Sequence, residues 1–176
     1  MNLNGQTVSV SGSGNVAQYA AEKATDLGAK VVTLSDSNGM IYVKDGISEE
    51  MLLEIMDLKN VKRGRLEDLA NVAGIEYIAG KRPWAVPVDI AMPCATQNEL
   101  NGEDAALLIH NGVKCVAEGA NMPSTLDAVD AFVAAQVLYA PGKASNAGGV
   151  ATSGLEMSQN EFSRSEERFS RNAETD

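Results

Sequence analysis

The chain is 176 residues long, 44% of them hydrophobic, with a formal net charge of −10. This size and apolar content suffice for one ordinary domain with a buried core. The acidic balance disfavours nucleic acid as a partner, because a phosphate backbone requires a basic surface. No run of residues approaches the roughly 18 apolar residues of a membrane span, and the N-terminal segment lacks the pattern of a signal peptide. A cytoplasmic location without membrane contact is therefore expected.

Cysteine and histidine, residue types that often bind metals or take part in catalysis, are few and scattered in this chain. The two cysteines, Cys94 and Cys115, lie far apart, and the single histidine is His110. This set matches no zinc-binding spacing and offers no base–nucleophile arrangement for hydrolysis. We therefore expect two buried, reduced thiols in a reducing compartment and no metal site.

The N-terminal half alternates short apolar segments with amphipathic ones. Strands are predicted at residues 7–11 and 30–34, with a helix at residues 16–27 between them, where apolar side chains recur at helical spacing. A short extra strand is predicted at residues 40–43. A helix follows that begins after Ser48, a residue type suited to an N-cap, and another runs from Arg65 to Gly74.

The C-terminal half continues this alternation. Strands are predicted at residues 75–78, 88–91, 113–117 and 137–139, with helices at 103–111 and 124–135 and a last helix from about residue 149. The pattern predicts an α/β fold with a mostly parallel sheet and helices on both faces. Residues 1–157 are expected to form one domain. Residues 158–176, rich in Ser, Glu and Arg, are expected to be partly disordered or to form a docking helix.

A glycine turn joins the first predicted strand to the first helix. It fits the pattern G-x-G-x-x-A with the residues Gly12, Ser13, Gly14, Asn15, Val16 and Ala17. Between a strand and a helix this pattern is typical of Rossmann-like, doubly wound folds that bind dinucleotides. The first glycine permits a tight turn, and the second lets a diphosphate approach the main chain and the helix N-terminus. The alternative is an ordinary strand-to-helix turn.

The choice between NAD and NADP stays open on these residues alone. Asp36 follows the second strand, where NAD enzymes use an acid to accept hydrogen bonds from the adenosine ribose. Four cations nevertheless fall within seven residues of this acidic chain: Lys59, Lys62, Arg63 and Arg65. Such a cluster near the ribose suits the 2′-phosphate of NADP; the alternative is an ordinary solvated helix end.

Three later segments carry a resemblance to a known family. PVDIAMPCATQNEL (residues 87–100), AEGANMP (117–123) and PGKASNAGGVATSGLEMSQN (141–160) resemble the hexameric glutamate dehydrogenases of bacteria. The resemblance covers nearly the whole chain up to Asn160, but only the coenzyme-binding domain of that family. It implies that the substrate domain, with the catalytic lysine and most glutamate contacts, is missing. No catalytic residue is therefore expected in this chain.

The resemblance also implies binding roles for particular residues. Ser153 would hydrogen-bond the side-chain carboxylate of glutamate, a feature that separates this group from the related leucine and phenylalanine enzymes, and Val150 would line the same pocket. Ser35, Lys59, Lys62 and Arg65 resemble the 2′-phosphate pocket of NADP-dependent members, so NADP is favoured over NAD. Those members also keep an acid at the position of Asp36, so this residue does not exclude NADP. The residues implied to bind the coenzyme, beyond the glycine turn, are Ser35, Asp36, Lys59, Lys62, Arg65, Ala95, Thr96, Asn121 and Asn146.

The activity that the resemblance implies is hydride transfer between L-glutamate and NADP(H), which gives 2-oxoglutarate and ammonia. The full enzyme would be a homohexamer. The chain alone is expected to bind dinucleotide without turning over glutamate. Two alternatives stay open: a stand-alone NAD(P)-binding regulatory module, and a fragment of an NAD-dependent glutamate dehydrogenase.

Overall fold

The computed structural model describes the backbone of residues 2–173 and the side chains of residues 2–160. The chain forms two compact units, residues 1–145 and residues 146–176. Among the described residues, no helix combines the length and the apolar character needed to cross a membrane.

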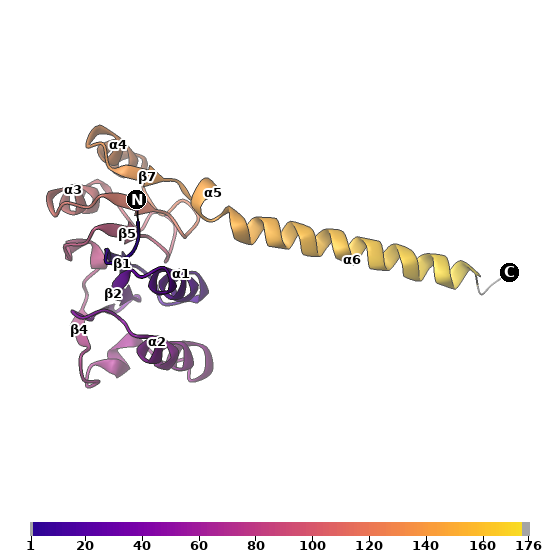
Figure 1. The fold of residues 1–176 in the computed structure, drawn as a ribbon, viewed down its shortest axis with the longest axis horizontal. Coiled ribbons are helices and arrows are strands. Elements are labelled where there is room, and N and C mark those ends of the chain that lie inside the picture. Colours follow the sequence, from indigo (N-terminus) through magenta and orange to yellow (C-terminus); the bar gives the residue numbers. More distant parts are fainter. Residues whose placement is uncertain (1, 174–176) are drawn as a thin grey trace. The chain divides into compact units, whose positions relative to one another are not determined.

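A seven-stranded sheet runs through the first unit in the order β4-β3-β2-β1-β5-β6-β7. Neighbouring strands are parallel except at β3, which is antiparallel to both β2 and β4. The predicted α/β class and the mostly parallel, Rossmann-like sheet are confirmed (Figure 1). The strands are β1 (Thr7–Val10), β2 (Lys30–Ser35), β3 (Gly39–Tyr42), β4 (Glu76–Ala79), β5 (Ile90–Met92), β6 (Cys115–Ala117) and β7 (Leu138–Ala140).

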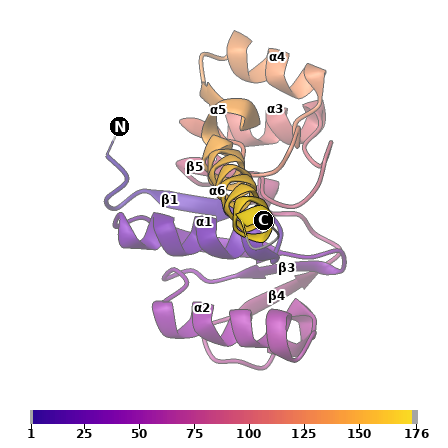
Figure 2. The ribbon, with the colours of Figure 1, turned by 90° about the vertical axis from the view of Figure 1, so that its right-hand side faces the viewer.

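Helices cover both faces of this sheet. α1 (Asn15–Asp26) and α2 (Glu49–Met56) lie on one side of the strands (Figures 1 and 2). α3 (Gly102–His110) lies on the other side and packs against α4 (Leu126–Ala134). The cause is the handedness of the connections: β1 to β2 and β5 to β6 cross the sheet in opposite directions, so right-handed crossovers place their helices on opposite faces.

Each face of the sheet has its own apolar core. On the first, α1 buries Ala17, Ala21 and Ala24, each at most 3% exposed. These small side chains let the helix backbone approach β1 and β2 closely. On the second, α3 and α4 pack around Leu108 and Phe132, both fully buried.

The segment between α2 and β4 departs from the predicted pattern. The helix predicted from Arg65 to Gly74 is wrong, because main-chain N–H groups at positions 68, 70, 72 and 75 bond the carbonyls three residues before them. Only a 3₁₀ turn forms, η2 (Leu66–Leu69), whose two buried leucines are also three residues apart. α2 runs instead into a π-helical turn, η1 (Asp57–Val61), which no sequence pattern predicted.

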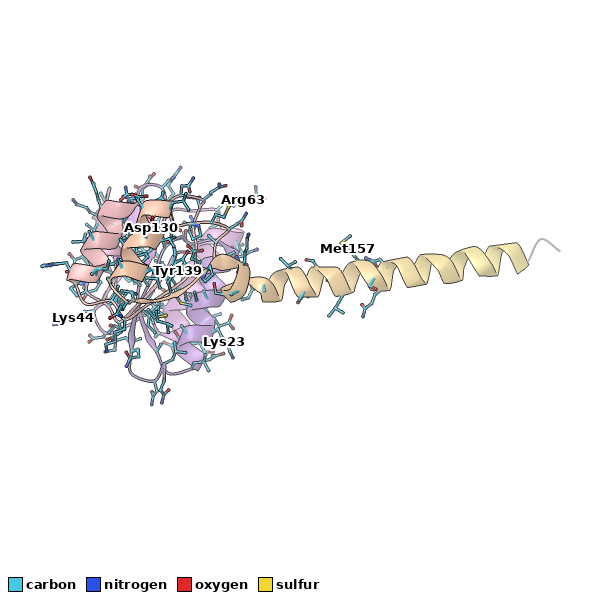
Figure 3. All side chains as sticks on the ribbon, turned by 90° about the horizontal axis from the view of Figure 1, so that it is seen from above. Lys23, Lys44, Arg63, Asp130, Tyr139 and Met157 are labelled. Carbon is cyan, nitrogen blue, oxygen red and sulfur yellow. The ribbon has the colours of Figure 1, made fainter. Side chains whose placement is uncertain are left out.

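Two short elements complete the first unit, η3 (Pro83–Ala85) and α5 (Gly142–Ser145), and the second unit contains α6 (Ala147–Ala173). The boundary predicted between residues 157 and 158 falls inside α6, and the division there stays a prediction. Apolar side chains on the described part of α6 are exposed, for example Met157 at 69% (Figure 3). The side chains of the predicted tail from residue 161 on lie outside the described residues.

Candidate functional site

A cavity of about 550 Å³ opens at the carboxyl ends of β1 and β5. Its place follows from the strand order: the chain leaves β1 toward β2 and leaves β5 toward β6, on opposite sides, so the two following loops diverge. Open α/β sheets bind ligands at this topological switch point. The lining residues come from the glycine turn, the end of β2, the segment between β4 and η3, and the loop after β5. They are Gly12, Ser13, Gly14, Asn15, Val16, Ser35, Asp36, Ser37, Arg82, Cys94, Ala95, Thr96 and Glu99.

Gly12 makes the tight turn that the sequence predicts for the first glycine. Its φ of +84° lies in the left-handed region that L side chains rarely adopt. A Cβ at this position would lie 3.0 Å from the carbonyl oxygen of Cys94. The Gly12 N–H donates to Oγ of Ser35 at 2.9 Å, and its carbonyl accepts from the Ser35 N–H at 3.0 Å. The protein's own packing therefore requires a glycine here.

Gly14, by contrast, is not required by the protein's own packing. Its φ of −84° and ψ of −172° are open to any residue, and a Cβ would meet no atom within 4 Å. Gly14 is the N-cap of α1, with no side-chain cap and no acidic residue in the first turn. The positive end of the helix dipole therefore lies beside the lining residues Asn15 and Val16, without a capping side chain or an acid in the first turn.

Asp36 lies at the rim of the cavity with its carboxylate already bound within the protein. Oδ1 accepts from the N–H of Asn38 and Oδ2 from the N–H of Leu66, both at 2.9 Å. Nζ of Lys59 lies 3.8 Å from Oδ2. Asp36 thus holds the start of η2 in place, and its charge is paired rather than free.

Two of the four cations in the predicted basic cluster, Lys59 and Arg65, contact residues that line the cavity. Nη1 of Arg65 donates to Oγ of Ser37, a lining residue, at 3.1 Å. Lys59 reaches the rim through Asp36, as above. Lys62 pairs with Asp57 at 2.7 Å, and its side chain is 68% exposed. The structure therefore brings Lys59 and Arg65 to the rim of the cavity, beside Asp36 and Ser37, but not Lys62.

The loop after β5 carries Ala95 and Thr96, which line the cavity. Glu99 holds this loop to the end of β1: its Oε1 accepts from Oγ of Ser11 and from the N–H of Ala95, both at 2.9 Å. Burial raises the pKa of the Glu99 carboxyl, although these hydrogen bonds act in the opposite direction. The loop is therefore fixed before any ligand binds.

Sequence reasoning missed Ser37, Arg82, Cys94 and Glu99 as lining residues. Glu99 lies within the quoted segment PVDIAMPCATQNEL, so that segment held the signal, whereas Arg82, which pairs with Asp104 at 2.9 Å, belongs to no motif. Burial raises the pKa of the Cys94 thiol to about 12, so the thiol is neutral. Both cysteines are free and buried, as predicted.

The other predicted site residues lie outside the lining of this cavity. Asn121 is exposed in the segment after β6. Asn146, Val150 and Ser153 belong to the second unit. Their implied roles stay predictions. Among the described residues, no group of three or more His, Cys, Asp or Glu side chains could hold a metal ion.

Comparison with known proteins identifies a family and several relatives that match most or all of this chain. The family model for glutamate/leucine/phenylalanine/valine dehydrogenase matches residues 1–176. The chain is 65% identical over 155 residues to the NADP-specific glutamate dehydrogenase of Haemophilus influenzae, covering 88% of this chain and 34% of that protein. It is 62% identical over 158 residues to the NAD(P)-specific glutamate dehydrogenase of Xylanibacter ruminicola, covering 90% and 36%.

The fold agrees with these relatives. A crystal structure of Plasmodium falciparum glutamate dehydrogenase superimposes with a TM-score of 0.84 at 51% identity, over 88% of this chain and 33% of that one. The chain spans about a third of the length of the curated relatives that it matches. Because the family model matches from end to end, the chain belongs to the glutamate/leucine/phenylalanine/valine dehydrogenase family.

Proposed function

We propose that this chain is the coenzyme-binding part of a glutamate dehydrogenase and that it binds NADP(H) in the cavity at the ends of β1 and β5. The contrast between two glycines carries the proposal. Gly12 is required by packing, whereas Gly14 leaves open the space of a side chain at the N-terminus of α1. A diphosphate needs such a close approach to main-chain N–H groups. The names of the relatives, NADP-specific and NAD(P)-specific, support a nicotinamide dinucleotide.

The proposed reaction interconverts L-glutamate with 2-oxoglutarate and ammonia. The coenzyme, when bound, supplies the redox chemistry by exchanging a hydride with the substrate. The residues of this chain bind and orient it: Ser11 and Glu99 hold the loop that carries Ala95 and Thr96 in one conformation. Such fixed placement supplies part of the rate.

The remaining parts of this function are proposed on the family resemblance. Val150 and Ser153 are the residues of this chain assigned to the glutamate side chain. The catalytic lysine is assigned to a part of the enzyme outside this chain, and the complete enzyme is proposed to be a homohexamer.

A preference for NADP over NAD is assigned to the rim around Asp36. Lys59 lies 3.8 Å from this carboxylate, and Arg65 hydrogen-bonds Ser37 beside it. Two cations and the hydroxyls of Ser35 and Ser37 suit a 2′-phosphate, which prefers charged donors. Because Asp36 is already bound to main-chain N–H groups, the phosphate meets a paired acid rather than a free one.

The substitution Gly14→Ala tests the proposal. Alanine fits the backbone at this position and should cost at most about 1 kcal/mol of stability, since it is a poorer N-cap than glycine. NADPH binding should weaken by at least about 10-fold, because the methyl group occupies the space through which the diphosphate approaches. Fluorescence titration with NADPH and urea unfolding of the same sample measure the two effects.

Gly12→Ala is the comparison variant, for which the main expected loss is in stability. Its Cβ would lie 3.0 Å from a main-chain oxygen at a φ of +84°, so the free energy of unfolding should fall by about 1–3 kcal/mol. A Gly14→Ala chain that binds NADPH as tightly as the wild type would contradict the proposed site.

A further inference from the structure

A buried amide connects the glycine turn to the segment that carries Lys59. Gln18 lies on α1 and is 0% exposed. Its Nε2 donates to the main-chain carbonyl of Ser13 at 2.8 Å and to Oδ1 of Asn60 at 3.1 Å. In return, Nδ2 of Asn60 donates to Oε1 of Gln18 at 2.9 Å. Both amide protons and the carbonyl of the buried side chain are therefore used, and two of these three bonds join it to Asn60.

Asn60 belongs to η1, the π-helical turn that follows α2. Such turns are rare and recur at functional sites. None of the five residues of η1 is fully buried, although Leu58 is partly buried and packs against the core on this face of the sheet. The reciprocal amide pair is a direct side-chain link from η1 to α1.

Lys59 directly precedes Asn60, so a displacement of the Asn60 backbone would also displace the backbone of Lys59. Nζ of Lys59 donates to the carbonyl of Gly64 at 3.0 Å and lies 3.8 Å from Oδ2 of Asp36. If η1 moved away from α1, this lysine would leave the rim. Neither Gln18 nor Asn60 lines the cavity itself.

We propose that Gln18 and Asn60 are positioning residues for NADP selectivity: their paired amides hold η1 against α1, which places Lys59 at the 2′-phosphate end of the site. The inference rests on the proposed function and deepens it. The bond from Gln18 to Ser13 fixes the end of the site that binds the diphosphate. The bonds from Gln18 to Asn60 fix the end that binds the 2′-phosphate. One buried side chain thereby sets the spacing between the two ends.

Asn60→Ala separates these two roles, because it leaves the bond between Gln18 and Ser13 in place. The dissociation constant for NADPH should rise about 5- to 10-fold, the effect of losing one well-placed polar contact. That for NADH should change less than about twofold, because NADH has no 2′-phosphate for Lys59 to contact. Gln18→Leu should weaken both coenzymes, since it also releases the Ser13 carbonyl.

A double-mutant cycle shows whether Asn60 acts through Lys59. In a Lys59→Ala background, Asn60→Ala should cause no further loss of NADPH affinity, because the group that it positions is gone. Additive losses, or equal losses for NADPH and NADH, would overturn the inference. If Asn60→Ala unfolds below the assay temperature, Asn60→Ser replaces it, because serine keeps a hydroxyl for the Gln18 carbonyl. The test is then the ratio of its dissociation constants for NADPH and NADH, compared with the wild-type ratio.

Asn111→Ala is the matched control. Nδ2 of Asn111 donates to the main-chain carbonyl of Ala85 at 3.2 Å, away from the lining of the cavity, so neither affinity should change. A wild-type chain that binds neither dinucleotide refutes the proposed function itself. A wild type that binds NADPH, with an Asn60→Ala variant of unchanged selectivity, refutes only the positioning role.

Discussion

Lys59 and Lys62 carry the same charge three residues apart, yet their surroundings give them different roles. The Lys59 side chain is 19% exposed and points its ammonium group toward Asp36, whereas the Lys62 side chain is 68% exposed and pairs with Asp57. A flexible lysine in solvent contributes little to a fixed binding site, because it must lose side-chain entropy on binding. Only the less exposed lysine is therefore assigned to the 2′-phosphate.

At the residue scale, Lys59→Ala should raise the dissociation constant for NADPH by about 10- to 100-fold, the range for a hydrogen bond to a charged group. NADH should bind nearly as before. Lys62→Ala, the matched control, should change neither constant by more than about twofold. Titration of both variants with both coenzymes measures this. A Lys62→Ala variant that loses as much NADPH affinity as Lys59→Ala would show that the lysines are not distinguished as described.

At the scale of elements, β1 and β5 are joined at the end opposite the cavity by Asp89. Its Oδ2 accepts from the N–H and the hydroxyl of Thr7, both at 2.8 Å, and its Oδ1 lies 2.7 Å from Nζ of Lys114. The hydrogen bonds from Lys114 and Thr7 hold the pKa of the Asp89 carboxyl below its usual value. This contact fixes the alignment of the two strands whose other ends form the site.

Asp89→Ala should lower the free energy of unfolding at neutral pH by about 1–3 kcal/mol, because the Thr7 N–H loses its acceptor. Since the pKa of Asp89 is lower in the folded than in the unfolded chain, its stabilisation is fully present above about pH 4, the unfolded value. It disappears as the pH falls through the folded-state pKa. Urea unfolding at neutral pH and near pH 2 should therefore show wild type and variant converging in acid.

Asp26→Ala is the control for this comparison, because Asp26 pairs with the exposed Lys23 at 3.5 Å. Exposed pairs of this kind contribute little, so its stability should follow the wild type at both pH values. A loss in Asp89→Ala that is the same at neutral and acid pH would show that the carboxylate charge is not the cause.

At the scale of the whole molecule, the chain contains the cavity but spans only about a third of the length of its curated relatives. The purified chain should bind NADPH yet reduce no NADP⁺ in the presence of glutamate, because the proposed function assigns the catalytic lysine to a part of the enzyme outside it. The absorbance of reduced nicotinamide measures this directly. Steady turnover by these residues alone would place the catalytic groups within the chain.

Much of the fold was predictable because it depends on local patterns. The alternation of apolar strands and amphipathic helices, the glycine turn and the α/β class all follow from residues close together in the chain. The segment between α2 and β4 was not predictable, because its short turns depend on distant contacts. One of them is the hydrogen bond from the Leu66 N–H to Asp36, 30 residues away. The pairing of β4 with β3 likewise joins residues far apart in sequence.

By itself, the sequence determined the type of fold and the place of the glycine turn, because backbone conformation at Gly12 and helical spacing along α1 are local properties. Its longer segments also indicated the family. Only the tertiary structure decided that Lys59 reaches the rim while Lys62 does not, and that Glu99 fixes the loop after β5. These positions depend on contacts such as Ser11 with Glu99, 88 residues apart, and such contacts exist only once the strands have assembled into a sheet.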